Sequence, residues 1–214
     1  PIAFWPGDRD GDPNLDLVVM HASVRTMRSA LAEAPFQYDP PSIPTENSLG
    51  WAACGDFDED GWPDVVRANP NANTLSVFLG DGQGSLALAA TLSNPGALAQ
   101  DVAVGDLDGD GHQDLACSSR DTGTVSPFLG DGQGGFTPAA FILVSGQPEA
   151  IALRDLNGDG DADVITLSRF TDEMTVVLSD GLGGYLPMAV YATQHWAEQL
   201  AFGDFDGDQA LDVA

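Results

Sequence analysis

The 214-residue sequence has few basic residues: seven lysines and arginines stand against 33 aspartates and glutamates, giving a formal net charge of −26. So few cations cannot neutralise many phosphates, which argues against nucleic acid as a partner. The same shortage argues against binding to an anionic membrane surface. No apolar run approaches the roughly 18 residues that a membrane-spanning helix requires, so we expect no membrane insertion.

Cysteine is scarce, and familiar catalytic motifs are missing. Cys54 and Cys117 are too few for a disulfide framework, and each lies in an apolar, strand-like run. We expect both to be buried thiols, with a bridge or a reactive site as the alternative. The sequence has no Gly-x-Ser-x-Gly, His-Glu-x-x-His or Walker motif, and His21, His112 and His195 are far apart. These absences predict that the chain is not an enzyme.

A nine-residue acidic pattern, by contrast, occurs five times. Side-chain oxygens recur at offsets 0, 2, 4 and 8, and the first residues of successive patterns are 48, 50, 49 and 49 positions apart. The residues are Asp8, Asp10, Asp12 and Asp16; Asp56, Asp58, Asp60 and Asp64; Asp106, Asp108, Asp110 and Asp114; Asp155, Asn157, Asp159 and Asp163; and Asp204, Asp206, Asp208 and Asp212. Two carboxylates about 4 Å apart repel by roughly 4 kcal/mol at an effective dielectric near 20, so such a cluster needs a cation.

Oxygen-only ligands on a short loop suit Ca²⁺, which accepts six to eight oxygens in a flexible geometry. Gly61, Gly111 and Gly160 at offset 5 permit a sharp turn, whereas Pro13 and Gln209 predict looser first and fifth loops. The pattern is not an EF-hand, because its twelfth position lacks Glu and strands are expected to follow. We predict up to five structural Ca²⁺ ions. The main-chain carbonyl at offset 6 is expected to add a ligand, from Asn14, Trp62, His112, Asp161 and Ala210.

The period of about 49 residues organises the whole chain. Each unit has an apolar stretch, the acidic loop, a second apolar stretch, a polar turn, a third strand, a glycine-rich turn such as Gly130–Gly134, and a more polar fourth strand. Asp-Gly between β-rich runs indicates a hairpin. Four short strands per repeat of 40–50 residues are typical of a β-propeller blade. A β-sandwich of repeated hairpins is the alternative.

The predicted fold class is therefore all-β, a β-propeller built from four-stranded blades. Almost no helix is expected. Only Arg25–Ala34 is ambiguous, because it has helical propensity and stands where the first unit would have its third strand and glycine-rich turn. Four full blades are expected near residues 1–49, 50–99, 100–149 and 150–198, with a partial fifth at 199–214.

The GDxDxDGxxD loops, each followed by an apolar strand and a GDGxG turn, resemble the FG-GAP/VCBS repeat family. This is the repeat of integrin α-subunit propellers and of many secreted bacterial and fungal proteins. The resemblance covers essentially the whole chain. It implies a propeller, usually of seven blades, with Ca²⁺ in the hairpin between strands one and two. The metal ligands that it implies are the carboxylates named above plus Asn157.

The resemblance also implies a role outside the cell in adhesion, in recognition of a glycan or protein, or in scaffolding. Low cytosolic Ca²⁺ would leave such sites empty, which supports an extracellular location, secreted or at the cell surface. Ligand contacts are expected on the face opposite the acidic loops. The candidates there are Trp196, His195, Phe170, Arg120 and Arg169.

Two other functions stay open. The chain starts at Pro1 without a visible signal peptide and stops at Ala214 inside an expected second strand, so we expect a processed, trimmed or partial chain. Half a blade leaves unpaired strand edges, so other copies of the chain could complete it in a filament or another homo-oligomer. The second alternative is an accessory domain of a larger secreted enzyme.

Overall fold

The computed structural model describes residues 4–7, 16–21, 26–30, 43–44, 51–82, 85–195, 197, 199–207 and 211–214; before residue 51 the description covers the backbone. Within these residues the structure is all β, without a helix. No helix long and apolar enough to cross a membrane occurs among them.

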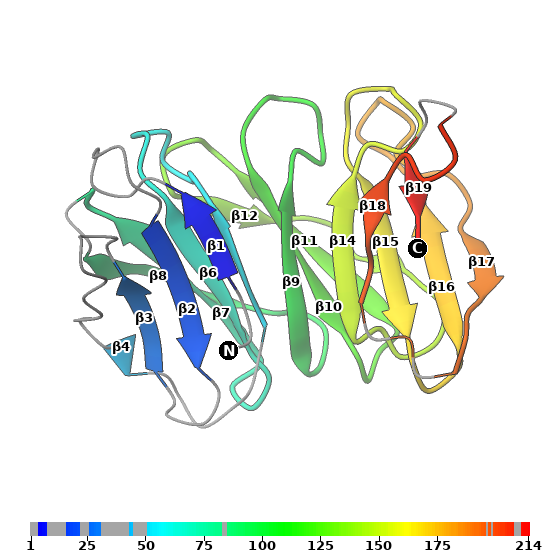
Figure 1. Ribbon diagram of the computed structural model, residues 1–214, viewed down its shortest axis with the longest axis horizontal. Coiled ribbons are helices and arrows are strands. Elements are labelled where there is room, and N and C mark those ends of the chain that lie inside the picture. The colour runs from blue at the N-terminus through cyan, green and yellow to red at the C-terminus, as the bar shows by residue number, and fades with distance from the viewer. Residues whose placement is uncertain are drawn as a thin grey trace.

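Strands that are neighbours in sequence pair antiparallel and form consecutive sheets, which follow one another across the molecule (Figure 1). The first sheet contains β1 (Phe4–Gly7), β2 (Asp16–His21), β3 (Thr26–Ala30) and β4 (Ile43–Pro44). The second contains β5 (Ala52–Gly55), β6 (Asp64–Asn69), β7 (Thr74–Gly80) and β8 (Leu86–Ser93).

The third sheet contains β9 (Ala99–Gly105), β10 (Asp114–Ser119), β11 (Thr124–Gly130) and β12 (Phe136–Pro138), and β13 (Ile142–Leu143) also pairs with β11. The fourth contains β14 (Ala150–Arg154), β15 (Asp163–Ser168), β16 (Glu173–Val177) and β17 (Ala189–Ala192). A final pair consists of β18 (Phe202–Gly203) and β19 (Asp212–Val213).

The ambiguous segment Arg25–Ala34 differs from the expectation. Its residues Thr26–Ala30 form β3, which pairs antiparallel with β2 and places Thr26 opposite His21. Pairing with the apolar strand β2 outweighs the local helical propensity, because tertiary context routinely overrides propensity. The expectation that the first unit lacks a third strand is therefore wrong. The rest of the segment lies outside the described residues.

The second strand of each central sheet is buried along its whole length, in β6, β10 and β15 alike. In β10, Leu115 and Cys117 pack in one apolar cluster with Val66, whereas Ala116 packs in another with Val164. Successive side chains of a strand point to opposite faces, so both faces of β10 are covered. The core is thus a series of apolar layers between adjacent sheets, which explains why these strands read as continuous apolar runs.

The first strands are less buried than the second strands. β9 contacts β5 and β6 of the second sheet and β14 of the fourth, yet β5 is only half-buried, and β9 and β14 contain both buried and half-buried residues. The fourth strands are the most exposed, with β17 exposed throughout, as expected of outer edge strands.

The two cysteines are not disulfide-bonded. Cys117 is buried in β10, and this burial raises the pKa of its thiol. Cys54 is half-buried in β5. The expectation of a buried thiol is confirmed for Cys117.

Candidate metal centres

Each acidic loop that the structure describes, in whole or in part, connects the first and second strands of its sheet. These loops follow β5, β9, β14 and β18. In Figure 1, β14 runs upward and β15 downward, so the loop between them lies along the upper edge. The repeat therefore places the described acidic loops at the same end of their sheets.

Three of these loops bring three carboxylates together. In each, one oxygen from the residues at offsets 0, 2 and 8 lies within 4.8 Å of the other two. Asp56 Oδ1 and Asp58 Oδ1 are also buried without a hydrogen-bond partner. Burying such an oxygen unpaired is costly, so a cation is a natural partner for it. The three groups are Asp56, Asp58 and Asp64; Asp106, Asp108 and Asp114; and Asp204, Asp206 and Asp212.

The crowding also affects protonation. Partial burial raises the pKa of Asp58 and of Asp108, and the negative charges of Asp60 and Asp110, respectively, raise them further. These carboxyl groups therefore hold their protons more tightly than an isolated aspartate does. A bound cation would reverse this preference, because an opposite charge favours the ionised form.

In the second to fifth loops the first aspartate binds the backbone of its own loop. Asp106 accepts hydrogen bonds from Gly109 N at 2.8 Å and Gly111 N at 2.9 Å, and Asp155 binds the equivalent amides at 2.7 and 3.1 Å. Gly111 and Gly160 have φ angles of 90° and 101°, a region that other residues rarely adopt. The prediction that glycine at offset 5 permits the turn is confirmed.

The residue at offset 8 ties the loop to the rest of its sheet, a role that sequence reasoning missed. Asp114 accepts hydrogen bonds from Leu107 N and from Gly130 N, both at 2.7 Å. Asp64 and Asp163 make the same two bonds in their own sheets, at 2.6 to 2.8 Å. Burial raises the pKa of Asp64 and of Asp114 to about 6, although the bonded amides lower it. One buried carboxylate thus joins the loop to the end of the third strand.

Asp60 and Asp110, the predicted ligands at offset 4 of the second and third loops, are not in the three groups. Asp60 Oδ1 and Asp110 Oδ1 each accept a hydrogen bond at 2.8 Å from the amide two residues further on. Ca²⁺–oxygen distances are about 2.3–2.6 Å, so ligands on opposite sides of an ion can be about 5 Å apart. A carboxylate on the far side of the ion can therefore lie more than 4.8 Å from the other ligands and still bind the ion. Asp60 and Asp110 stay predicted ligands.

The fourth loop differs from the others. Asn157 replaces one carboxylate, and its Nδ2 donates to Asp159 Oδ2 at 3.0 Å and to the carbonyl oxygen of Ser179 at 3.3 Å. The carboxylate of Asp161 is buried and accepts a hydrogen bond from Ser179 Oγ at 3.1 Å. The structure brings no three acidic ligands together in this loop, all of which is described.

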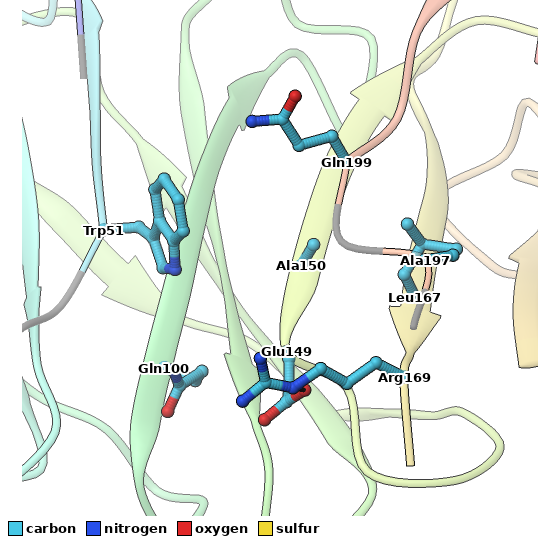
Figure 2. Close-up of a pocket in the computed structure, with 8 residues that line it drawn as sticks. All are labelled: Trp51, Gln100, Glu149, Ala150, Leu167, Arg169, Ala197 and Gln199. Atoms are coloured by element: carbon cyan, nitrogen blue, oxygen red, sulfur yellow. Dashed lines mark ion pairs between the residues drawn. The ribbon is translucent and has the colours of Figure 1, made fainter. Parts of the chain in front are cut away.

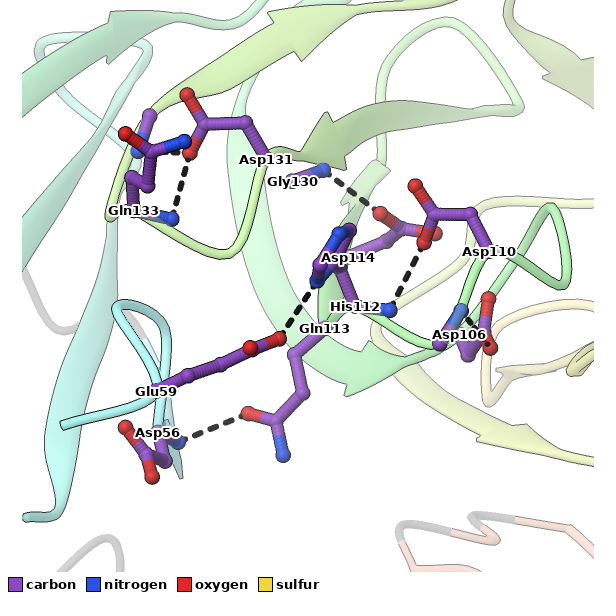
Figure 3. A network of polar contacts seen from close by, with 12 residues as sticks. Asp56, Glu59, Asp106, Asp110, His112, Gln113, Asp114, Gly130, Asp131 and Gln133 are labelled. Atoms are coloured by element: carbon purple, nitrogen blue, oxygen red, sulfur yellow. Dashed lines mark hydrogen bonds and ion pairs between the residues drawn. The ribbon is translucent and has the colours of Figure 1, made fainter. Parts of the chain in front are cut away.

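Neighbouring loops are also joined to each other. Gln113 Oε1 accepts a hydrogen bond from Asp56 N at 2.9 Å, and Glu59 Oε1 lies 2.6 Å from His112 Nδ1 (Figure 3). The contact with Glu59 raises the pKa of His112. A backbone hydrogen bond of 2.7 Å likewise joins the third loop to the fourth. The repeat pattern gave no signal for these contacts, because it describes each unit alone.

The remaining predicted ligands fall mostly outside the described residues. These are Asp8, Asp10, Asp12 and Asn14 in the first loop and Asp208 and Ala210 in the fifth. Asp16 is described as the first residue of β2. Calcium binding by these residues stays a prediction.

A second polar cluster lies beside the starts of the first strands. Glu149 Oε1 is 3.6 Å from Arg120 Nη1, and its Oε2 is 2.5 Å from Arg169 Nε. The guanidinium carbons of Arg120 and Arg169 are 4.8 and 5.1 Å from the ring centroid of Phe170. The structure therefore brings together three of the five residues that the sequence proposed for ligand contacts.

The other two proposed contact residues are His195 and Trp196. His195 is exposed, with its Nδ1 2.9 Å from Asp172 Oδ2. Trp196 lies outside the described residues. Sequence reasoning missed Glu149, which binds both arginines and is the link that holds the cluster together.

The family model described as FG-GAP-like repeat matches residues 56–117, 106–166 and 155–214, which together make up more than half of the chain. The chain belongs to the FG-GAP-like repeat family. The resemblance that its motifs indicated is thus confirmed. No curated protein matches the sequence.

Solved structures of low identity share the fold of this FG-GAP-like chain. An Agrocybe aegerita lectin that recognises non-reducing terminal N-acetylglucosamine is 20% identical, with a TM-score of 0.60 over 89% of this chain and 52% of the lectin. The periplasmic gluconolactonase of Pseudomonas aeruginosa is 19% identical, with a TM-score of 0.58 over 84% and 54%. BBS1N, in a complex with ARL6DN, is 13% identical, with a TM-score of 0.61 over 100% and 62%.

The FG-GAP-like chain spans between about half and three fifths of these proteins. At such identities the likeness concerns the fold. Membership of the FG-GAP-like repeat family indicates a binding or scaffold module.

The comparisons correct the expectation that the chain is not an enzyme. The gluconolactonase has this fold, as do two proteins described as 6-phosphogluconolactonases, from Bacteroides uniformis and Bacteroides fragilis, at 12% and 18% identity. The expectation was wrong because it rested on missing motifs, and one fold can carry many activities.

Proposed function

We propose that this FG-GAP-like chain is a calcium-stabilised β-propeller module that binds a glycan or a protein outside the cell. The carboxylate groups at equivalent places in the second, third and last sheets carry the proposal. In the second loop, the buried oxygens of Asp56 and Asp58 that have no hydrogen-bond partner give it independent support. A donor set made only of oxygens, on one short loop, suits Ca²⁺ better than a transition metal.

The carboxylates at offsets 0, 2, 4 and 8 and the carbonyl at offset 6 would hold the ion, in up to five loops. Its charge would offset their repulsion and fix the hairpin between the first two strands. With millimolar Ca²⁺ and dissociation constants of about 10⁻⁴–10⁻³ M, each site would contribute about 0.4–1.4 kcal/mol to the free energy of unfolding. Several sites together would approach the net stability of a domain.

The repeats would be the blades of the propeller. The successive antiparallel sheets and the apolar layers between them support this assignment. So does the likeness in fold to the lectin and the gluconolactonase. The proposed blades comprise about residues 1–49, 50–99, 100–149 and 150–198, with a partial fifth at 199–214.

The extracellular location rests on the expected affinity, because sites with dissociation constants near 10⁻⁴–10⁻³ M fill only at millimolar Ca²⁺. The lectin's recognition of a sugar supports a glycan as the ligand of this chain. BBS1N, which forms a complex with another protein, supports a protein ligand as the alternative.

Thermal unfolding with and without Ca²⁺ tests the calcium role. Millimolar Ca²⁺ should raise the melting temperature by several degrees, EDTA should reverse the increase, and Mg²⁺ should reproduce little of it. Asp108→Ala should reduce the calcium-dependent increase, because Asp108 belongs to a carboxylate group. Asp121→Ala removes an exposed acidic residue outside the loops and should leave the increase unchanged. The proposal would be contradicted by a melting temperature that EDTA does not change. It would also be contradicted if Asp108→Ala and Asp121→Ala changed the calcium-dependent increase equally.

A further inference from the structure

The sides of the first strands enclose a polar hollow. One cavity of about 240 Å³ is lined by Trp51, Gln100, Glu149, Arg169 and Gln199, among others (Figure 2). A second cavity, of about 310 Å³, shares two of these residues, Trp51 and Gln199, and adds Asp101 and Arg154. We call the two adjoining cavities the strand-one hollow. It explains why Gln100 and Asp101 of β9 and Ala150 of β14 are only half-buried.

The repeat brings these side chains together. Trp51, Gln100 and Glu149 are 49 residues apart in succession, and each stands at or near the start of a first strand. Arg120 and Arg169 are also 49 residues apart. In the acidic loops the repeat places the same residue type at equivalent positions, whereas in the hollow each repeat supplies a different polar or aromatic group. A few convergent polar groups in a concave site are typical of a binding pocket.

The lining combines an aromatic ring with hydrogen-bonding groups. The side chain of Trp51 is 38% exposed, and Figure 2 shows its indole facing the same space as the side chain of Gln199. The amides of Gln100 and Gln199 offer both donors and acceptors. An indole provides a flat apolar surface, and amides beside it can pair with hydroxyl groups. A ring with an apolar face and hydroxyls around its edge, which is the chemistry of a sugar, fits this lining.

The charge around the hollow is unlike that of the rest of the protein. The chain carries a net charge of −26 and seven basic residues. Two of them, Arg154 and Arg169, line the hollow, and a third, Arg120, pairs with the lining residue Glu149; the acidic residues among the described lining are Glu149 and Asp101. Glu149 is shared between two guanidinium groups. Guanidinium binds carboxylate through paired hydrogen bonds, so a local excess of arginine favours an anionic ligand.

We propose that the strand-one hollow binds one sugar ring that carries a carboxylate, such as a uronic acid. The proposal rests on the proposed binding function and names its site and ligand class. The apolar face of the ring would lie on Trp51, its hydroxyls would reach Gln100 and Gln199, and its carboxylate would pair with Arg169. Cavities of this size are near the lower end of the range of about 300–1,000 Å³ for small-ligand sites, so they suit a single ring.

Isothermal titration calorimetry on the full chain in Ca²⁺ tests the proposal. The ligands are D-glucuronate and D-galacturonate, with D-glucose and D-galactose as neutral counterparts and acetate as a carboxylate without a ring. We expect at least one uronate to bind ten-fold or more tightly than its neutral counterpart and than acetate. Equal affinities for a uronate and its neutral counterpart, or no uronate binding at millimolar concentration, would overturn the proposal.

Substitutions of individual lining residues measure the contribution of each one to uronate binding. Trp51→Ala should abolish uronate binding, and Arg169→Gln should weaken it about ten-fold and remove the preference over the neutral sugar. Glu149→Gln should strengthen uronate binding several-fold, because it removes the carboxylate that now occupies the arginines. A loss of structure could not produce this gain. Tyr191→Ala, at an exposed aromatic residue in β17, is the matched control and should leave binding unchanged.

Weaker uronate binding by Glu149→Gln, or unchanged binding by Trp51→Ala, would overturn the assignment to the hollow. Melts of the same proteins in Ca²⁺ and in EDTA distinguish the two proposals. If the melts respond to Ca²⁺ but no uronate binds, the hollow assignment fails and the calcium role stands. If a uronate binds and Ca²⁺ does not change the melting temperature, the calcium role fails and the hollow assignment stands.

Discussion

The carboxylate of Asp114 accepts a hydrogen bond of 2.7 Å from the backbone amide of Gly130, 16 residues further along the chain. Its other oxygen accepts one of the same length from Leu107 N, within the acidic loop. One buried side chain therefore connects the loop, the start of β10 and the end of β11. Because Asp114 also belongs to a carboxylate group, binding a cation there would couple directly to the hydrogen bonding of the sheet.

Asp114→Ala should lower the free energy of unfolding by about 2–6 kcal/mol, because a buried and a partly buried amide lose their acceptor at about 1–3 kcal/mol each. Urea denaturation in EDTA measures this effect without a contribution from bound Ca²⁺. Asp121→Ala, at an exposed residue, is the control and should change the value by less than about 0.5 kcal/mol. Similar values for the two variants would mean that the two hydrogen bonds do not stabilise the fold.

The sequence predicted the features that repeat within each unit. Short apolar stretches and Asp-Gly turns placed the strands, and the continuous apolar runs predicted the buried second strands, such as β10. The spacing of the aspartates predicted the loops in which Asp56, Asp58 and Asp64 meet. These predictions succeed because hairpins and short loops are set by residues close together in the chain.

Features that join different units could not be predicted in this way. The side chain of Gln113 reaches the loop of the preceding sheet, and Glu149 lies between arginines from two other turns. The hollow that leaves parts of β9 and β14 half-buried also arises only when the sheets come together. In β3, pairing with β2 overrode local propensity. Each of these depends on the arrangement of the sheets, which the repeat pattern does not specify.

Asn73 fixes the connection between the second and third sheets. Its Nδ2 donates to the carbonyl oxygens of Asn94 and Gly96 at 2.9 and 2.6 Å, and its Oδ1 accepts a hydrogen bond from Ala99 N at 3.1 Å. Its own φ angle is 54°, in the left-handed region. The side chain and the backbone conformation therefore contribute separately to this connection.

Asn73→Gly should cost about 1–3 kcal/mol, because it removes these hydrogen bonds but keeps the backbone conformation accessible. Asn73→Ala should cost about 1 kcal/mol more, because a left-handed conformation is unfavourable for alanine. Urea denaturation of the two variants measures the difference. An alanine variant as stable as the glycine variant would show that the positive φ angle imposes no cost at this position.

Asp101 joins the third sheet to the fourth. Its Oδ1 accepts a hydrogen bond from Val102 N at 2.8 Å, and its Oδ2 accepts one from Ile151 N of β14 at 3.1 Å. Burial raises the pKa of Asp101 from 3.8 to about 7, although both amides lower it. The folded protein therefore holds this proton more tightly than the unfolded chain does.

The stability contributed by Asp101 should thus be fully present below about pH 4 and be lost as the pH rises to about 7. Asp101→Asn stays neutral, so it should lose less stability than the wild type between pH 5 and pH 8. Urea denaturation at both pH values in saturating Ca²⁺ measures the difference and limits the contribution of the acidic loops. Asp121→Asn is the control and should follow the wild type. Parallel pH profiles for Asp101→Asn and the wild type would contradict the raised pKa.

Gln113 lies in the third loop, yet its Oε1 accepts a hydrogen bond of 2.9 Å from the backbone amide of Asp56, the first residue of the second loop. This contact should help to hold the second loop in its metal-binding conformation. Gln113→Ala should therefore weaken cation binding at the second loop several-fold without removing any of its ligands. Trp62 lies within that loop, so energy transfer from its indole to bound Tb³⁺ can report on this site.

Titration of Tb³⁺ into the wild type and Gln113→Ala measures the change, and displacement by Ca²⁺ shows that both ions occupy one site. Trp62→Phe should remove most of the sensitised emission and so assign the signal to the second loop. Gln133→Ala, at an exposed residue of the glycine-rich turn, is the matched control and should bind Tb³⁺ as the wild type does. Identical Tb³⁺ affinities for Gln113→Ala and the wild type would show that each loop binds its cation independently of the neighbouring sheet.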